Sequence, residues 1–427
     1  MRISKEWHDR LHILIPYYRR VLKLSQNDVY RRHGNYKWII SPATVKKLEN
    51  HEQVFIKDEK YQELLFNLNE QLHISQKIDH YLITQSKQLY CVMETERYEE
   101  AIRIIETTLL SLKSQRHHVY YKECIFFLGK LFLYLKDRIF MNDQEYSLLF
   151  PLVNIFPKGF KDILMDFLYI HASGANEKKL SAFFSSYSME ASAYLPNRIN
   201  YANQLYEENK ELRAYLILKE AEPVAREKGS KNQLAYIYII LSSIALHIDI
   251  ELCYSYLHML EKMLTEEHED NNLKGMILLN LANRYLMLRN YVRCSNYTKA
   301  YIVLNPKRHY TSNIISLSYC NQMLNKEKDK TLFVNDNLTS EYDDQLEYSL
   351  FSYYKQTFKN NKERMKFLQD KVCPNLTAFD KIYTRIVSDE ITRLSSESGS
   401  YVNYFRFHAL LKNDLHSFSE DHWQYQR

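Results

Sequence analysis

The sequence predicts an all-α protein, with a small basic N-terminal domain followed by an array of helix pairs. Glycine and proline are scarce, at 7 and 8 of 427 residues, whereas sheet proteins usually need more of both for their tight turns. Long segments of apolar and charged residues run without helix-breaking positions. A chain of this length is long enough for more than one domain. We therefore expect one domain at residues 1–72 and a second at residues 73–427.

The basic charge of the chain is concentrated at its N-terminus. Residues 1–60 contain 13 Lys and Arg against 7 Asp and Glu, while the remaining residues contain 44 basic against 45 acidic side chains. The formal charge of +5 therefore belongs to the N-terminal segment. Such an asymmetry favours an anionic partner for this segment, and nucleic acid is the first candidate.

Four helices are predicted in that segment. Apolar residues recur at helical spacing in the first, at Leu11, Leu14, Ile15, Tyr18, Val21 and Leu22. Ser25 is a typical N-cap for the second helix, and Gly34 has the backbone freedom to end it. Ser41 caps the third helix, with Pro42 in its first turn. The fourth contains Tyr61, Leu64, Leu65 and Leu68.

The third helix has a basic outer side. Ala43, Val45 and Leu48 are expected to face inward, which leaves Thr44, Lys46 and Lys47 outward. On these residues alone, two interpretations stand. The helix is either part of a DNA-binding unit or the solvated basic side of an ordinary helical bundle.

The segments SQNDV (25–29) and ISPATVKKLEN (40–50), with Gly34 between them, resemble the lambda-repressor-type (XRE) helix-turn-helix. That family's pattern is roughly S-Q-x-x-L-A, a glycine turn, then V-S-x-x-T-I-S-x-I-E-N-G. The resemblance implies that Gln26 begins the first helix of the motif at the phosphate backbone. It also implies a recognition helix in the major groove that carries Ser41, Ala43, Thr44, Lys46 and Lys47.

The sequence departs from this pattern in two places. Five residues, NYKWI (35–39), are inserted before the recognition helix, and His51 replaces the usual terminal glycine. The insertion either adds DNA contacts through Tyr36 and Lys37 or changes the angle between the two helices.

The rest of the chain carries a degenerate repeat. Small residues recur where two helices of a pair would touch, at Ala101, Ala202, Ala214, Cys253, Ala282 and Cys294. The slots at 214, 253 and 294 are separated by 39 and 41 residues. This pattern resembles tetratricopeptide repeats, which implies a right-handed superhelix of stacked helix pairs with a concave face.

Polar residues recur at one register of this array. Asn203, Asn283 and Asn321 directly follow the small residue of a first helix, and Ser242 has the same place by counting back from Cys253. The resemblance places this register on the concave face, where asparagine amides bind the backbone of an extended peptide. Tyr206 and Met287 are expected to line the same groove. The alternative is that these amides satisfy helix ends or one another.

Catalysis, metal binding and membrane insertion have little support. The chain has no phosphate-binding glycine loop and no H-E-x-x-H or G-x-S-x-G motif, so no enzyme activity or cofactor is expected. The six cysteines are widely spaced, with no C-x-x-C, which is typical of buried thiols in a reducing cytosol. No apolar run approaches 18 residues, and we expect a cytoplasmic protein without membrane contact.

Together, the two resemblances are those of peptide-pheromone-responsive regulators of Gram-positive bacteria, the Rgg, PlcR, PrgX and NprR type. They imply a homodimer that binds double-stranded DNA and a short signalling peptide that modulates this binding in quorum sensing. Two alternatives remain: a Rap-type protein that binds a response regulator, and a repeat scaffold that binds no DNA. The sequence of the operator, that of the peptide, and the direction of regulation are left open.

Overall fold

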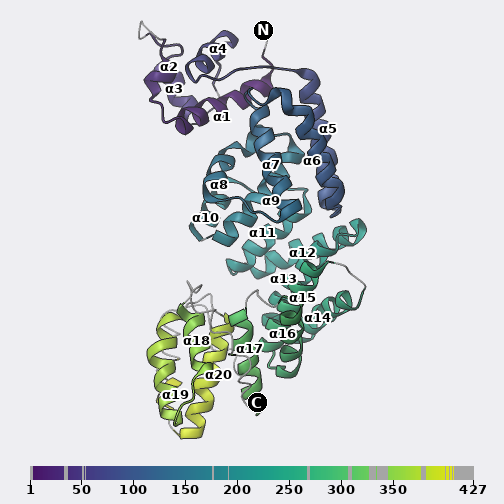
Figure 1. The fold of residues 1–427 in the computed structure, drawn as a ribbon, viewed down its shortest axis with the longest axis vertical. Helices are drawn as coiled ribbons and strands as arrows, with labels where there is room; N and C mark the ends of the chain where they lie inside the picture. Colours follow the sequence, from purple (N-terminus) through teal and green to yellow (C-terminus); the bar gives the residue numbers. More distant parts are fainter. Residues whose placement is uncertain are drawn as a thin grey trace. The chain divides into compact units, whose positions relative to one another are not determined.

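The chain is almost entirely helical in the part that the computed structural model describes (Figure 1). That part comprises residues 3–32, 37–50, 52, 54–175, 177–190, 192–266, 270–305, 310–326, 333, 345–376, 381–399, 401–402, 404–405 and 407. Among these residues, β-structure is limited to two isolated bridges, Arg31 with Trp38 and Gln71 with His118. The predicted all-α class is confirmed.

The chain divides into two units, Met1–Leu234 and Ala235–Arg427. The first contains α1 Lys5–Val21, α2 Gln26–Tyr30, α3 Pro42–Glu49, α4 Asp58–Asn67, α5 Gln76–Glu94, α6 Tyr98–Leu112, α7 Tyr121–Asp137, α8 Asp143–Leu149, α9 Lys158–Ala175, α10 Glu177–Ser186, α11 Leu195–Glu207 and α12 Glu211–Lys228. Helix α13 (Lys231–Ile248) begins in the first unit and continues in the second. The second contains α14 Ile250–Thr265, α15 Asn271–Met287, α16 Tyr291–Leu304, α17 Tyr310–Met323, α18 Gln345–Lys355, α19 Asn361–Phe367 and α20 Lys381–Ser398.

Helices α1–α4 form what we call the head. Ser4, Ser25 and Ser41 start α1, α2 and α3, and each side chain accepts a backbone N–H of the first turn. The apolar stripes of the four helices meet in one core, in which Leu11, Leu14, Val29, Val45, Leu48, Tyr61 and Leu64 are buried. Local capping therefore sets where the helices begin, and burial of the stripes packs them together.

The head is joined to the helices that follow by a buried polar contact. The Trp7 indole donates a hydrogen bond of 2.7 Å to Asp79 on α5. Arg10 is 2% exposed, and its guanidinium carbon lies 3.8 Å from the ring centroid of Tyr120. The predicted boundary at residue 72 thus falls inside the first compact unit.

Helices α5–α6, α11–α12 and α15–α16 form close pairs, and α5 and α6 lie side by side in Figure 1. The small residues at the predicted contact slots, including Ala202, Ala214 and Cys294, are buried. Close approach also explains Gly159 at the start of α9, because an added Cβ would lie 2.3 Å from the carbonyl oxygen of Ser86 on α5. Small residues therefore let the helix backbones approach each other.

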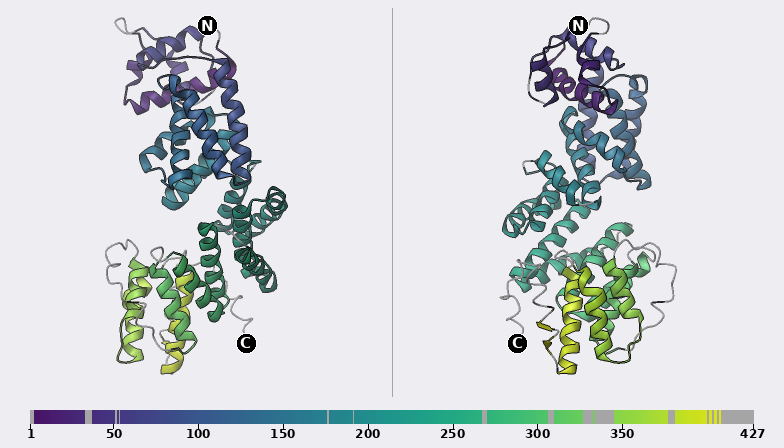
Figure 2. Two further views of the ribbon diagram at one scale, coloured as in Figure 1. Left: turned by 45° about the vertical axis from the view of Figure 1, so that its right-hand side comes forward. Right: turned by 90° about the vertical axis from the view of Figure 1, so that its left-hand side faces the viewer.

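In the second unit, two adjacent carboxylates of α20 hold its neighbours. Asp389 accepts a hydrogen bond of 2.6 Å from Tyr319 on α17 and pairs with Arg289 at 3.0 Å. Glu390 is 1% exposed and pairs with Arg393 at 2.9 Å and with Arg364 at 3.4 Å. Figure 2 shows α18, α19 and α20 as neighbouring helices. No helix in the described residues is both long and apolar enough to cross a bilayer.

Glu123 on α7 makes the stability of the first unit depend on pH. The residue is 5% exposed, and its carboxylate accepts hydrogen bonds from Tyr18 at 2.5 Å and from the Tyr120 backbone at 2.6 Å. Burial nevertheless raises the pKa of Glu123 from 4.5 to about 7. The native state therefore binds a proton that the unfolded state releases, and stability falls as the pH rises from 4.5 to 7.

We expect Glu123→Gln to remove this dependence. Between pH 5 and pH 8 the free energy of unfolding of the variant should rise by about 2.5 kcal/mol relative to that of the unsubstituted protein. Urea unfolding over this pH range measures the difference. Parallel pH profiles for the two proteins would contradict the protonation of Glu123 in the native state.

Candidate nucleic-acid interface

Contacts within its own first turn determine where helix α3 begins. Ser41 accepts a hydrogen bond of 3.2 Å from the Thr44 backbone, and Pro42 occupies the first turn. Val45 and Leu48 are buried at 2% and 0% exposure, so one side of α3 is fixed in the core of the head. The opposite side faces solvent.

Glu49, the last residue of α3, anchors that helix to both of its predecessors. Its carboxylate accepts two hydrogen bonds from Arg19 of α1, at 2.6 and 2.7 Å, and one from the Tyr30 hydroxyl of α2, at 2.5 Å. Burial disfavours the charge, but the hydrogen bonds from Arg19 and Tyr30 hold the pKa of Glu49 below its ordinary value. The two hydrogen bonds between the Arg19 guanidinium and the Glu49 carboxylate fix the relative orientation of the two groups as well as their separation.

Helix α2 is short and ends in a hairpin stem. Its capping box joins Ser25 and Asp28, and it ends at Tyr30 because Arg31 is already extended. Arg31 pairs with Trp38 in an antiparallel bridge and lies over its ring at 4.5 Å. The helix therefore stops before the predicted end at Gly34, which is outside the described residues, as is Tyr36. The part of the insertion that is described, Lys37 to Ile39, belongs to this stem.

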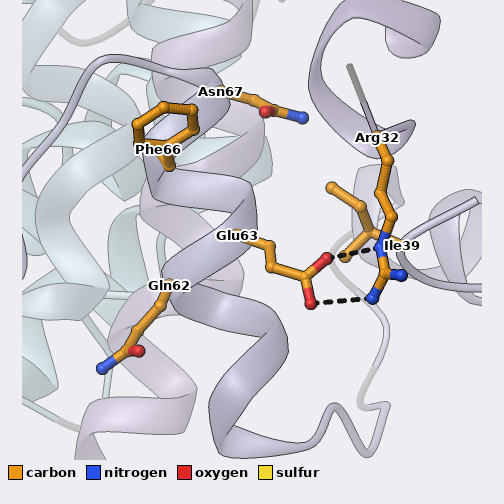
Figure 3. Close-up of a pocket in the computed structure, with 6 residues that line it drawn as sticks. All are labelled: Arg32, Ile39, Gln62, Glu63, Phe66 and Asn67. Carbon is orange, nitrogen blue, oxygen red and sulfur yellow. Dashed lines mark hydrogen bonds and ion pairs between the residues drawn. The ribbon is translucent and has the colours of Figure 1, made fainter. Parts of the chain in front are cut away.

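A hollow of about 430 Å³ separates the hairpin stem from α4 (Figure 3). Its lining residues are Arg32, Ile39, Gln62, Glu63, Phe66 and Asn67. Arg32 and Glu63 point toward each other across it and form two hydrogen bonds, of 2.9 and 3.1 Å. The Asn67 amide donates to the carbonyl oxygens of Val29 and Arg31. These contacts attach the end of α2 and the first half of the hairpin stem to α4.

The cationic side chains of the head differ in their partners. Arg19, Arg32 and Lys60 form ion pairs with carboxylates. Lys46 and Lys47 are exposed on α3, and within the described residues no carboxylate pairs with either. The outward side of α3 is therefore positively charged, as an anion-binding surface requires.

The predicted DNA-binding residues fall on three segments of the head. Ser41, Ala43, Thr44, Lys46 and Lys47 belong to the cap and body of α3, Gln26 begins α2, and Lys37 belongs to the hairpin stem. All are exposed except Thr44, which is half-buried. The inward direction predicted for Ala43 is wrong, because residues two apart on a helix lie on nearly opposite sides and Val45 is the buried one.

The sequence assigns no role to the residues that hold the helices of the head in place. Arg19, Tyr30 and Glu49 converge from three helices, although they lie up to 30 residues apart in the sequence. Glu49 lies in the segment that matches the family pattern, but that match gives it no function. The family pattern therefore pointed to Glu49, whereas nothing in the sequence identified Arg19 and Tyr30 as the partners of Glu49.

In the first unit, Asn203 has a structural partner. Its amide donates a hydrogen bond of 3.2 Å to the Tyr169 hydroxyl on α9, and Asn200, one turn earlier, donates to Asp166 at 2.8 Å. These two asparagines form a polar seam between α11 and α9. Tyr206 is 8% exposed and contributes little to an open surface.

In the second unit, Ser242 is fully buried, and its hydroxyl donates to the Ile239 carbonyl of its own helix. It therefore does not line an open groove, contrary to the prediction from the repeat register. Asn283, Met287 and Asn321 are half-buried. No described residue hydrogen-bonds the Asn283 or Asn321 amide, so both remain candidates for peptide contact.

Comparison of the chain with protein-family models, curated proteins and solved structures found no match. Among the residues that the structure describes, no group of three or more His, Cys, Asp and Glu side chains is arranged to hold a metal ion.

Removal of the Glu49 charge should loosen α3. We expect Glu49→Gln to lower the free energy of unfolding by about 2 kcal/mol at pH 7, because half-buried Arg19 loses its ionic partner. Since the native pKa of Glu49 is lowered, its contribution is present above pH 4.5 and is lost as the pH falls through the native value. Urea unfolding and hydrogen exchange of the α3 amides measure both effects.

The matched control is Glu52→Gln, because exposed Glu52 accepts a hydrogen bond of 3.2 Å only from the Asn50 side chain among the described side chains. It should leave stability almost unchanged. Equal losses in the two variants would contradict the anchoring role of Glu49.

The two asparagine environments predict different effects on stability. Asn203→Ala removes the hydrogen bond to Tyr169 and should cost about 1 kcal/mol. Asn283→Ala removes no hydrogen bond to a described residue. It should change the free energy of unfolding by only about a few tenths of a kcal/mol, because alanine favours helix. A loss in Asn283→Ala as large as that in Asn203→Ala would show that Asn283 is also structural.

Proposed function

We propose that this chain is a cytoplasmic DNA-binding transcriptional regulator of the helix-turn-helix type. The main observation in support is the arrangement of α3, with one side buried, its end anchored through Glu49, and Lys46 and Lys47 exposed on the other side. An anchored helix with two exposed lysines on its outward side suits insertion into the major groove. Gln26, at the start of α2, is exposed where it would contact a phosphate.

The proposal includes a homodimer, in which two heads bind two half-sites of DNA. Two identical reading units match a palindromic operator, whose half-sites lie about one helical turn apart. Pairing of the heads also doubles the number of phosphate contacts, which raises affinity and makes it more dependent on salt.

We further propose that the helix pairs bind a short signalling peptide that modulates DNA binding. The half-buried amides of Asn283 and Asn321 support this role, because each has both a donor and an acceptor to offer a peptide backbone. Such a peptide changes DNA affinity only to the extent that it binds two conformations of the protein differently.

The direct test measures binding of the full-length protein to its own upstream DNA by gel shift across a range of salt concentrations. We expect sequence-preferring binding that weakens steeply as salt rises, because cations on the protein displace counterions from DNA. The double variant Lys46→Ala/Lys47→Ala should bind at least about tenfold more weakly at low salt.

The matched control is Lys77→Ala/Lys113→Ala, which removes two exposed lysines outside the head. It should retain the affinity of the unsubstituted protein. No binding at low salt, or equal binding by both double variants, would exclude α3 as a DNA-binding element.

A further inference from the structure

The outward side of α3 presents an unusual set of groups. Lys46 and Lys47 follow Ala43 by three and four residues, so both lysines lie on the side of the helix that carries Ala43. All three are exposed. In its first two turns, this side therefore carries two ammonium donors and one methyl group.

The hydrogen-bond acceptors of the same turns are engaged within the protein. Ser41 Oγ accepts from the Thr44 backbone at 3.2 Å and lies 2.8 Å from the Thr44 hydroxyl. The carboxylate of Glu49, which ends the helix, is turned inward to Arg19 and Tyr30. Only Asn50, at the C-cap, keeps an outward amide, and its NH₂ donates to Glu52.

These groups limit which bases the helix recognises. Guanine presents two acceptors in the major groove, N7 and O6, and lysine binds both. Cytosine presents an amino donor that needs a carboxylate, and adenine is bound by an amide that accepts and donates at once. Because Glu49 is anchored inside the head, the helix has no free carboxylate. The lysine donors of its first two turns therefore suit the two acceptors of guanine.

We infer that α3 recognises a half-site marked by guanines, to which Lys46 and Lys47 donate in the major groove. The Ala43 methyl group then lies against the C5-methyl of a neighbouring thymine, the apolar contact that this base offers. This inference rests on the proposed DNA-binding function and specifies which bases the site selects. It depends on the Glu49 anchor, because a lysine that reads a base must approach from a fixed helix.

Lysine also binds phosphate as a point charge, and the experiment must separate the two modes. The full-length protein is first used to select duplexes from a random-sequence library at moderate salt. Each guanine of the selected half-site is then replaced by 7-deazaguanine, which keeps base pairing and the phosphate charge but has no N7 acceptor. 7-Deazaadenine replacements in the same half-site serve as the control duplexes.

We expect the selected sites to contain guanine at fixed positions. Replacement of a recognised guanine by 7-deazaguanine should weaken binding roughly tenfold, as for loss of a specific base contact. The 7-deazaadenine duplexes should bind as the parent does. Lys46→Met and Lys47→Met should each relax the preference at one guanine, while Lys77→Met should leave the selected sequence unchanged.

The outcomes separate the inference from the proposed function. Sequence-preferring binding without a loss on 7-deazaguanine would overturn base recognition by these lysines and leave DNA binding intact. Uniform weakening by Lys46→Met and Lys47→Met on every sequence would also overturn it, because it indicates phosphate contact alone. Absence of any DNA binding would overturn the proposed function itself.

Discussion

The carboxylate of Glu49 is the interaction on which the arrangement of the head depends. Three donors from two other helices converge on it, and it lies at the end of the helix that carries the exposed lysines. Apolar packing of Val45 and Leu48 would tolerate some rotation of α3 about its axis. The paired hydrogen bonds with Arg19 do not, because a guanidinium binds a carboxylate in one plane. Burial therefore holds the helix in the head, and Glu49 sets the direction of its outward side.

Buried carboxylates that accept several hydrogen bonds also occur elsewhere in the chain. In the second unit, Asp389 and Glu390 gather arginines and tyrosines around α20. Glu123 on α7 is the contrasting case, because the hydrogen bond from Tyr18 does not offset its burial and its pKa stays raised. A buried carboxylate costs desolvation energy, and its partners compensate only when their positions are correct. Hydrophobic stripes alone leave such helices several packing angles, so these polar clusters select one.

Local chemistry explains which features were predictable from the sequence. Ser41 and Pro42 start α3 through contacts within one turn, and small residues such as Ala202 lie where helices touch. The partners of Glu49 were not predictable, because they come from distant residues. The prediction for Ser242 was wrong for another reason. Helix α13 is apolar on nearly all sides around this residue, so the repeat register could not show which side of the helix was open.

The junction of the head with the first unit constrains how a regulator of the proposed kind transmits a signal. Arg10 and Trp7 of α1 are buried against Tyr120, the N-cap of α7, and Asp79 of α5, so the head is not tethered by a free linker. Rotation of the head relative to α5 and α7 would break the hydrogen bond from Trp7 to Asp79 and separate Arg10 from the Tyr120 ring. Each of these contacts contributes on the order of 1 kcal/mol, which is comparable with a coupling energy of about 1–3 kcal/mol. A peptide of the proposed kind would therefore spend most of its coupling energy on breaking them, unless the head moved together with α5 and α7.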